Sequence, residues 1–309
     1  MSDVRFISAQ PATNYYAWQV EVFIENFKSV GYSEDKIDVL CGITEGVPEN
    51  WINLQVKYPE ANFYFYQDTQ VDRSYGPSIR PHLLNKHFRR FDGLAGEVFF
   101  YHDCDFIFTR HMDFSPFLGD NNWYMSDVRS YIGPEYVESK GEGLLEMMSR
   151  VVGICDCTVR ARKENTGGAQ RLIKNVGTDY WGKVEEDTMK LYNWLKINKD
   201  RFGDNKVNDI QIWTSDMWAE LWNIWKAGIK TSTPKSFDFC WATCPIEKMN
   251  DVYFMHNAGV MKTRKDLFFK GGFVDKNPYI SNVSVDKKRC SSAYYDAVKS
   301  TGVYSVLNL

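Results

Sequence analysis

The sequence predicts an α/β fold in which a mainly parallel central sheet is flanked by helices. Short apolar runs of strand length alternate with segments that have helical spacing, and such alternation implies crossover connections. Residues 98–101 (Val-Phe-Phe-Tyr) are apolar at every position, which is typical of a parallel strand buried on both faces. The chain has 309 residues, of which 44% are hydrophobic and 25% charged. With no Pro/Gly/Ser-rich linker or repeat, we expect one continuous domain.

The first part of the chain is expected to alternate regularly. Strands are predicted at 3–9, 37–42, 62–67 and 98–101, and helices at 15–30, 49–58 and 77–91. Gly31 stops the first of these helices. Neither Gly-x-Gly-x-x-Gly nor a Walker sequence follows the first strand, so a dinucleotide site or P-loop is not expected.

The second part is less regular. We expect a short strand within 120–127, helices at 141–152, 185–196 and 213–227, and an apolar stretch at 252–255. Gly228 ends the helix at 213–227. The segment from Thr166 to Gln170 is predicted to begin another helix, with Thr166 as its N-cap.

Two acids follow the buried strand at 98–101. In an open α/β sheet, ligands bind outside the carboxyl ends of strands, where Asp103 and Asp105 fall. Two carboxylates this close repel each other, and a divalent cation removes the conflict. Hard oxygen ligands suit Mg²⁺ or Mn²⁺, which bind substrate phosphates as well. The alternative is a solvated acidic turn that caps the next element.

Basic and imidazole side chains complete this predicted metal–diphosphate site. Arg80 opens the helix before the acidic strand and suits the fork geometry of a phosphate, whereas Arg89 and Arg90 are expected on a solvated face. His256 ends an apolar stretch, where a neutral imidazole can complete the coordination of an ion held by Asp103 and Asp105. The alternative for His256 is a structural role.

Together these residues resemble the metal-dependent GT-A glycosyltransferases, and within them the hydroxyproline O-arabinosyltransferase and peptidyl-serine galactosyltransferase group. The resemblance spans most of the chain at low similarity. It rests on Arg80-Pro81, Asp103-Cys104-Asp105, Gly167-Gly168-Ala169-Gln170, Trp213 with Asp216-Met217, and His256-Asn257.

The resemblance implies a UDP-sugar donor that delivers a pentose such as arabinose, or a hexose. Residues 1–119 would form the half that binds the nucleotide-sugar, and 120–309 the half that binds the acceptor. The metal ligands would be Asp103, Asp105 and His256. Donor contacts would come from Arg80, Asp103, Gly167, Gly168 and Lys262, and catalytic roles would fall to Asp216 and Gln170.

The chemistry can also be stated from the residues alone. A metal on both phosphates neutralises the leaving group, and the acceptor hydroxyl must be placed against the anomeric carbon. A carboxylate serves as a base if the configuration inverts, or stabilises or attacks the oxocarbenium-like state if it is retained. Asp216 and Glu220 lie one helical turn apart on one face, and either can fill this role.

The acceptor is left open by the sequence. Residues 255–309 hold nine Lys/Arg and four Asp, a local +5 in a chain of net charge −3. A basic segment suits a polyanion, so one candidate acceptor is a hydroxymethylated pyrimidine in phage DNA. A peptide hydroxyl or a glycan is the alternative. Alternative functions are non-catalytic carbohydrate binding and a metal-dependent phosphohydrolase or nucleotidyltransferase. The excess of 10 Trp and 18 Tyr supports carbohydrate binding, although we expect a Trp-rich core to account for most of these residues.

The remaining features concern location. Residues 1–7 carry no signal pattern, no apolar run is long enough to span a membrane, and the Golgi anchor of the resembled group is missing. Seven scattered cysteines predict a reduced compartment, with Cys155 and Cys157 structural. We therefore expect a cytoplasmic bacterial or viral enzyme without a membrane partner. The oligomeric state is left open.

Overall fold

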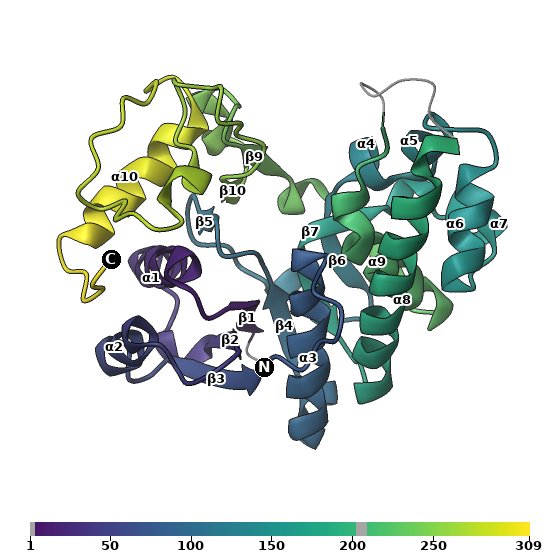
Figure 1. The fold of residues 1–309 in the computed structure, drawn as a ribbon, viewed down its shortest axis with the longest axis horizontal. Helices are drawn as coiled ribbons and strands as arrows, with labels where there is room; N and C mark the ends of the chain where they lie inside the picture. Colours follow the sequence, from purple (N-terminus) through teal and green to yellow (C-terminus); the bar gives the residue numbers. More distant parts are fainter. Residues whose placement is uncertain (1–3, 202–208) are drawn as a thin grey trace. The chain divides into compact units, whose positions relative to one another are not determined.

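The computed structural model describes residues 4–201 and 209–309, which form two compact units. One unit, here the N/C unit, comprises residues 4–67, 102–116 and 235–309. The other, here the middle unit, comprises residues 68–101 and 117–234. The units interleave along the sequence, and Figure 1 shows the elements of each. The predicted strand at 3–9 begins at Asp3, which lies outside the described residues.

The N/C unit begins with the predicted alternation of strands and helices. β1, β2 and β3 are parallel, with β2 in the middle, and a second small sheet places β10 between β5 and β9. Its strands are β1 (Val4–Pro11), β2 (Ile37–Ile43), β3 (Asn62–Gln67), β5 (Phe106–Phe108), β9 (Phe239–Trp241) and β10 (Phe254–His256). Its helices are α1 (Asn14–Ser29), α2 (Glu49–Lys57) and α10 (Cys290–Gly302).

Aromatic side chains build the core of this unit. Phe6 on β1, Phe27 on α1 and Phe108 on β5 are buried and meet edge to face, with ring centroids 4.9–5.9 Å apart. Seven of the ten tryptophans in the chain are buried. The aromatic excess is therefore mostly core.

The middle unit carries a sheet of mixed direction. β7 lies between β4 and β6 and is antiparallel to both, whereas β8 is parallel to β6. Its strands are β4 (Val98–Tyr101), β6 (Trp123–Asp127), β7 (Gly167–Lys174) and β8 (Thr231–Ser232). Its helices are α3 (Ile79–Arg90), α4 (Arg129–Ile132), α5 (Pro134–Glu138), α6 (Leu144–Val152), α7 (Asp156–Ala161), α8 (Thr178–Asn198) and α9 (Ser215–Lys226). In Figure 1, α8 lies against both α3 and α9.

The predicted α/β class with mainly parallel strands is confirmed, because β1–β2, β2–β3 and β6–β8 pair in parallel. The helix predicted to start at Thr166 is wrong, since residues 167–174 form β7. All eight residues of β7 are buried, so the strand shows no alternation of apolar and polar residues. Two adjacent glycines also disfavour a helix start.

β7 is irregular where it passes β6. Met125 pairs with Arg171 and the next residue, Ser126, pairs with Gly168. Ala169 and Gln170 of β7 therefore have no paired residue on β6. One of them, Ala169, has a φ of 53°, in the left-handed region that non-glycine residues rarely adopt. Bulges of this kind re-aim side chains and are common beside active sites.

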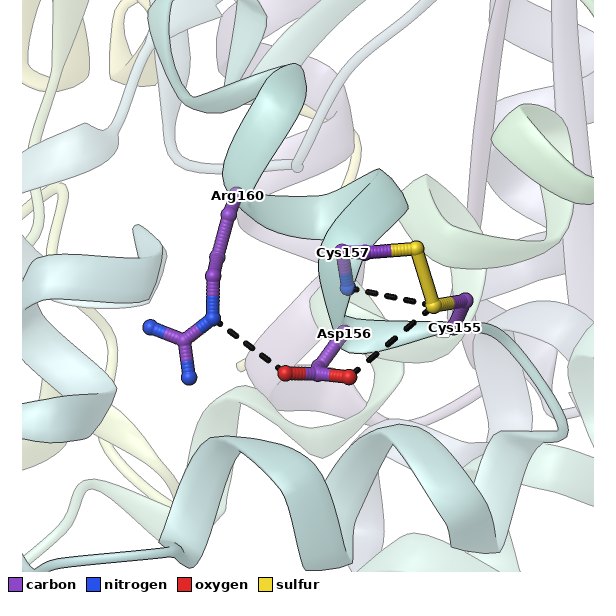
Figure 2. The surroundings of a disulfide bond; sticks show 4 residues. All are labelled: Cys155, Asp156, Cys157 and Arg160. Carbon is purple, nitrogen blue, oxygen red and sulfur yellow. Dashed lines mark hydrogen bonds and ion pairs between the residues drawn. A yellow bond between two sulfur atoms is a disulfide. The ribbon is translucent and has the colours of Figure 1, made fainter.

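Cysteine pairing departs from the expected reduced state. Cys155 and Cys157 form a disulfide at the start of α7 (Figure 2). The other five cysteines are free. The Asp156 carboxylate between them accepts a hydrogen bond from Arg160 at 3.2 Å. Among the described residues, none of the helices is long and apolar enough to cross a membrane.

Candidate active site

Asp103, Asp105 and His256 converge in the N/C unit. His256 is the last residue of β10 and pairs with Phe106, the first residue of β5, so the strand register brings its ring beside Asp105. Its Nε2 atom lies 3.1 Å from Oδ1 of Asp105 and 3.6 Å from Oδ2 of Asp103. One ligand atom of each residue lies within 4.8 Å of the others. The sequence-predicted metal ligands therefore form one cluster.

The cluster suits a divalent cation. Two carboxylates and one imidazole offer hard oxygens and one nitrogen, a donor set that fits Mn²⁺ or Mg²⁺. Asp105 and His256 are buried, whereas the Asp103 side chain is 25% exposed. A near-parallel stack with the Trp241 ring, at 16° and 5.9 Å between centroids, fixes the imidazole plane. The site is thus rigid on its inner side and reachable at Asp103.

The middle residue of the motif anchors the loop. Cys104 is buried and donates its thiol to Oε1 of Gln10 at 2.9 Å. Gln10 in turn donates to the Leu40 carbonyl at 3.0 Å, so the loop is tied to β1 and β2. Burial lowers the pKa of the neighbouring His102 to about 4, so this ring is neutral near pH 7. Packing of Cys104 thus accounts for the burial of the loop at Cys104 and Asp105, whereas Asp103 stays partly exposed.

Lys270 is a member of this cluster that the sequence did not indicate. Its ammonium forms an ion pair with Oδ2 of Asp105, the oxygen that does not contact His256. Burial alone would raise the pKa of Asp105, but Lys270 and His256 outweigh it and hold the pKa well below its usual range. A lysine within Phe-Phe-Lys-Gly-Gly-Phe carries no motif that would have identified it.

A small cavity adjoins the segment that carries Lys270. That segment is a 3₁₀ turn, Lys270–Phe273, and Phe273 also lines the cavity. The cavity has a volume of about 100 Å³, and its wall includes Asn14 and Trp18 from the start of α1 and Leu309 at the C-terminus. It is a partly open space of mixed polarity within the N/C unit.

Asp216 and Arg80 meet in the middle unit. Asp216 lies in the first turn of α9 and is 5% exposed, and Arg80 lies in the first turn of α3. Nη2 of Arg80 lies 2.6 Å from Oδ2 of Asp216, and the hydroxyl of Tyr75 lies 2.6 Å from Oδ1. The carboxylate is thus fully engaged by protein groups. Burial, and then the Asp216 charge, raise the pKa of Tyr75, so its hydroxyl stays protonated.

The Gly-Gly-x-Gln segment is explained by packing and by one hydrogen bond. A Cβ on Gly167 would lie 2.4 Å from Met125, and one on Gly168 would lie 2.6 Å from Met217, next to Asp216. Gln170 is fully buried at the β7 irregularity and accepts a hydrogen bond from Ser126 at 2.9 Å. Packing against Met125 and Met217 therefore explains why both positions are glycine, without a role in ligand binding.

Other predicted residues are placed separately. Glu220 is buried and pairs with Arg171 at 2.8 Å. Arg89, Arg90 and Lys262 are exposed. The exposure of the two arginines agrees with the solvated face predicted for them. The metal-type cluster belongs to the N/C unit, and Arg80, Gln170 and Asp216 belong to the middle unit.

An exposed indole lies close to Asp216 along the chain. Trp213 is 54% exposed, and its ring is nearly parallel to that of Tyr131, at 19° and 6.5 Å between centroids. The Tyr75 hydroxyl that faces Asp216 lies 2.6 Å from the Trp213 carbonyl as well. The backbone under this aromatic pair is therefore tied to the Asp216 network.

The sequence matches no protein-family model and no curated protein. Among solved structures, the chain is similar to the apo form of WbbM, a bifunctional glycosyltransferase, with a TM-score of 0.51 and 12% identity. The similarity covers 99% of this chain and 50% of that protein, so the chain spans about half its length. The galactosyltransferase LgtC, bound to donor and acceptor sugar analogues, aligns over 96% of both chains, with a TM-score of 0.47 and 15% identity. The likeness to WbbM shows the fold of a glycosyltransferase.

Proposed function

We propose that this chain is a metal-dependent glycosyltransferase that moves a sugar from a UDP-sugar to a hydroxyl acceptor. The observation that carries the proposal is the Asp103–Asp105–His256 cluster, placed by strand register in a glycosyltransferase fold. Bound Mn²⁺ or Mg²⁺ would act as a Lewis acid that neutralises the departing diphosphate. A carbohydrate-binding protein would have no use for this donor set beside a lysine that pairs with Asp105.

The chain's own residues then divide the work. Asp103, Asp105 and His256 hold the ion, and Lys262 and Arg80 contribute positive charge toward the donor phosphates. The cavity next to Phe273 is the candidate site for the donor base. Gln170 and Asp216 remain the proposed catalytic residues, with Asp216 acting through the Arg80 guanidinium that it binds. Whether a pentose such as arabinose or a hexose is transferred depends on contacts near Gln170.

For the acceptor we propose a sugar or peptide hydroxyl ahead of hydroxymethylated DNA. Three of the nine basic side chains in the +5 segment already face carboxylates of that segment, because Lys287 pairs with Asp296, Arg264 with Asp266 and Arg289 with Asp286. Lys270 is likewise engaged by Asp105. A DNA-binding face needs cations that are directed at phosphates.

The test is incubation of the purified chain with UDP-sugars and Mn²⁺, followed by mass spectrometry of an acceptor panel. Slow UDP release, stopped by a chelator, supports the glycosyltransferase. Sugar binding without turnover would identify a lectin, and cleavage without sugar specificity would identify a phosphohydrolase.

The panel contains a glycan, a hydroxyproline peptide and hydroxymethylcytosine DNA. A gain in the mass of the DNA would show that hydroxymethylated DNA is an acceptor. Its binding should then weaken with salt by about one log unit per log unit of salt for each phosphate contact. Changing Lys287, Lys288 and Arg289 together to Ala should flatten that slope without affecting hydrolysis of the UDP-sugar.

A further inference from the structure

We propose that Lys270 is an exchangeable cation: it holds Asp105 while the metal site is empty and turns to the donor diphosphate when the metal binds. This inference rests on the proposed function, because it needs a divalent ion at Asp103, Asp105 and His256. It assigns to Lys270 two partners that alternate with the loading of the site.

The first step is the charge balance of the cluster. Asp105 is 4% exposed, and a buried carboxylate needs a partner of opposite charge. His256 contacts one oxygen of Asp105, and the Lys270 ammonium contacts the other. Lys270 therefore supplies to Asp105 the positive charge that a divalent ion would otherwise supply. An ion that binds here must compete with this ammonium and repel it.

The second step is the contrast between a fixed backbone and a mobile side chain. Phe268, two residues before Lys270, is buried and its amide donates to the Ser291 hydroxyl at 2.8 Å. On the other side, the Phe273 carbonyl accepts a hydrogen bond from the Trp18 indole at 3.3 Å. The segment is thus held at both ends, whereas the lysine side chain is 26% exposed and has a flexible four-carbon stem.

The third step is the destination of the displaced ammonium. A diphosphate that binds the ion brings anionic oxygens next to the ligands of that ion. The flexible side chain of Lys270 is long enough to move its ammonium from Asp105 to those phosphate oxygens. An ammonium is a suitable point charge for phosphate. One lysine would in this way couple metal loading to donor binding.

The coupling predicts opposite effects on two affinities. Lys270→Met removes the competitor, so Mn²⁺ alone should bind at least about tenfold more tightly, which corresponds to ~1.4 kcal/mol. The same change removes a phosphate contact, so UDP should bind at least about tenfold more weakly at saturating Mn²⁺. A variant that was merely misfolded would lose both affinities.

The experiment measures Mn²⁺ binding by electron paramagnetic resonance and UDP binding by calorimetry, on the full chain. Lys265→Met, an exposed lysine of the same unit, is the matched control and should change neither affinity by more than about twofold. Lys270→Arg keeps the charge and should lie between the wild type and Lys270→Met. Unchanged or weaker Mn²⁺ binding by Lys270→Met overturns the exchange, and so does unchanged UDP binding. If the wild type itself binds no Mn²⁺, the metal-dependent function fails first.

Discussion

Arg80 binds a single oxygen of Asp216 through two of its nitrogens, with Nε at 3.0 Å and Nη2 at 2.6 Å from Oδ2. The pair connects the first turn of α3 to the first turn of α9, and Tyr75 faces the other oxygen. Both oxygens of this carboxylate therefore accept hydrogen bonds from protein side chains. Its effect on the reaction would pass through the position of Arg80.

This relationship predicts a non-additive pair of substitutions. Asp216→Asn should lower kcat about 10- to 100-fold, the effect of a lost charge-assisted hydrogen bond, and change UDP affinity less than about threefold. Arg80→Met should lower kcat at least as much. If Asp216 acts through Arg80, the double variant is no slower than Arg80→Met alone. Losses that multiply in steady-state kinetics would instead place Asp216 at the reacting centre.

The glycines of β7 give a prediction about stability. A Cβ at Gly168 would meet the Met217 methyl group at 2.6 Å and Val128 at 3.0 Å, so Gly168→Ala should cost about 1–3 kcal/mol of unfolding free energy. Adding Met217→Ala makes room, and the double variant should be more stable than the sum of the two single effects by about 1 kcal/mol.

Urea denaturation measures these changes. Gly119→Ala is the matched control, since nothing lies within 4 Å of its Cβ position, and it should have little effect. A stable Gly168→Ala variant that has lost UDP-sugar affinity would show that the position is kept small for the donor.

These two places also show what the sequence could predict. The regular parallel strands β1, β2 and β3 have turn signals and apolar runs, and their bounds were predicted to within about two residues. β7 was missed because Gln170, Arg171 and Lys174 are polar residues buried in a strand, with partners on other elements. Asp103, Asp105 and His256 were predicted together from strand ends, whereas Lys270 reaches the cluster from a turn with no pattern.

The metal cluster predicts a loss of ligand-induced stabilisation. Wild-type protein should be stabilised by Mn²⁺, by about 2.7 kcal/mol when the free ion is 100 times its Kd. Asp105→Ala should abolish this stabilisation and reduce UDP-sugar turnover to the level seen with a chelator. Asp251→Asn, at an exposed carboxylate of the same unit, should keep both properties. Thermal unfolding with and without Mn²⁺ measures this stabilisation. If Mn²⁺ still raises the unfolding temperature of Asp105→Ala, the metal binds at another site.

The exposed Trp213, stacked with the half-buried Tyr131, predicts where an acceptor ring binds. An indole that is 54% exposed and joined through Tyr75 to the Asp216 network offers a flat apolar face beside buried charges. Stacking of a nucleic-acid base on an aromatic face is worth about 1–3 kcal/mol, and we take this range for an acceptor ring on Trp213. Trp213→Ala should therefore raise the acceptor KM about 5- to 100-fold, while hydrolysis of UDP-sugar without acceptor and the unfolding midpoint stay near wild type.

Trp213→Phe should recover part of the loss, because a smaller ring remains. Tyr304→Ala, which removes a 77% exposed aromatic ring from the N/C unit, serves as the control and should leave the acceptor KM unchanged. If Trp213→Ala leaves the KM of every acceptor in the panel unchanged, the acceptor does not use this face, and the exposed indole has no part in the reaction.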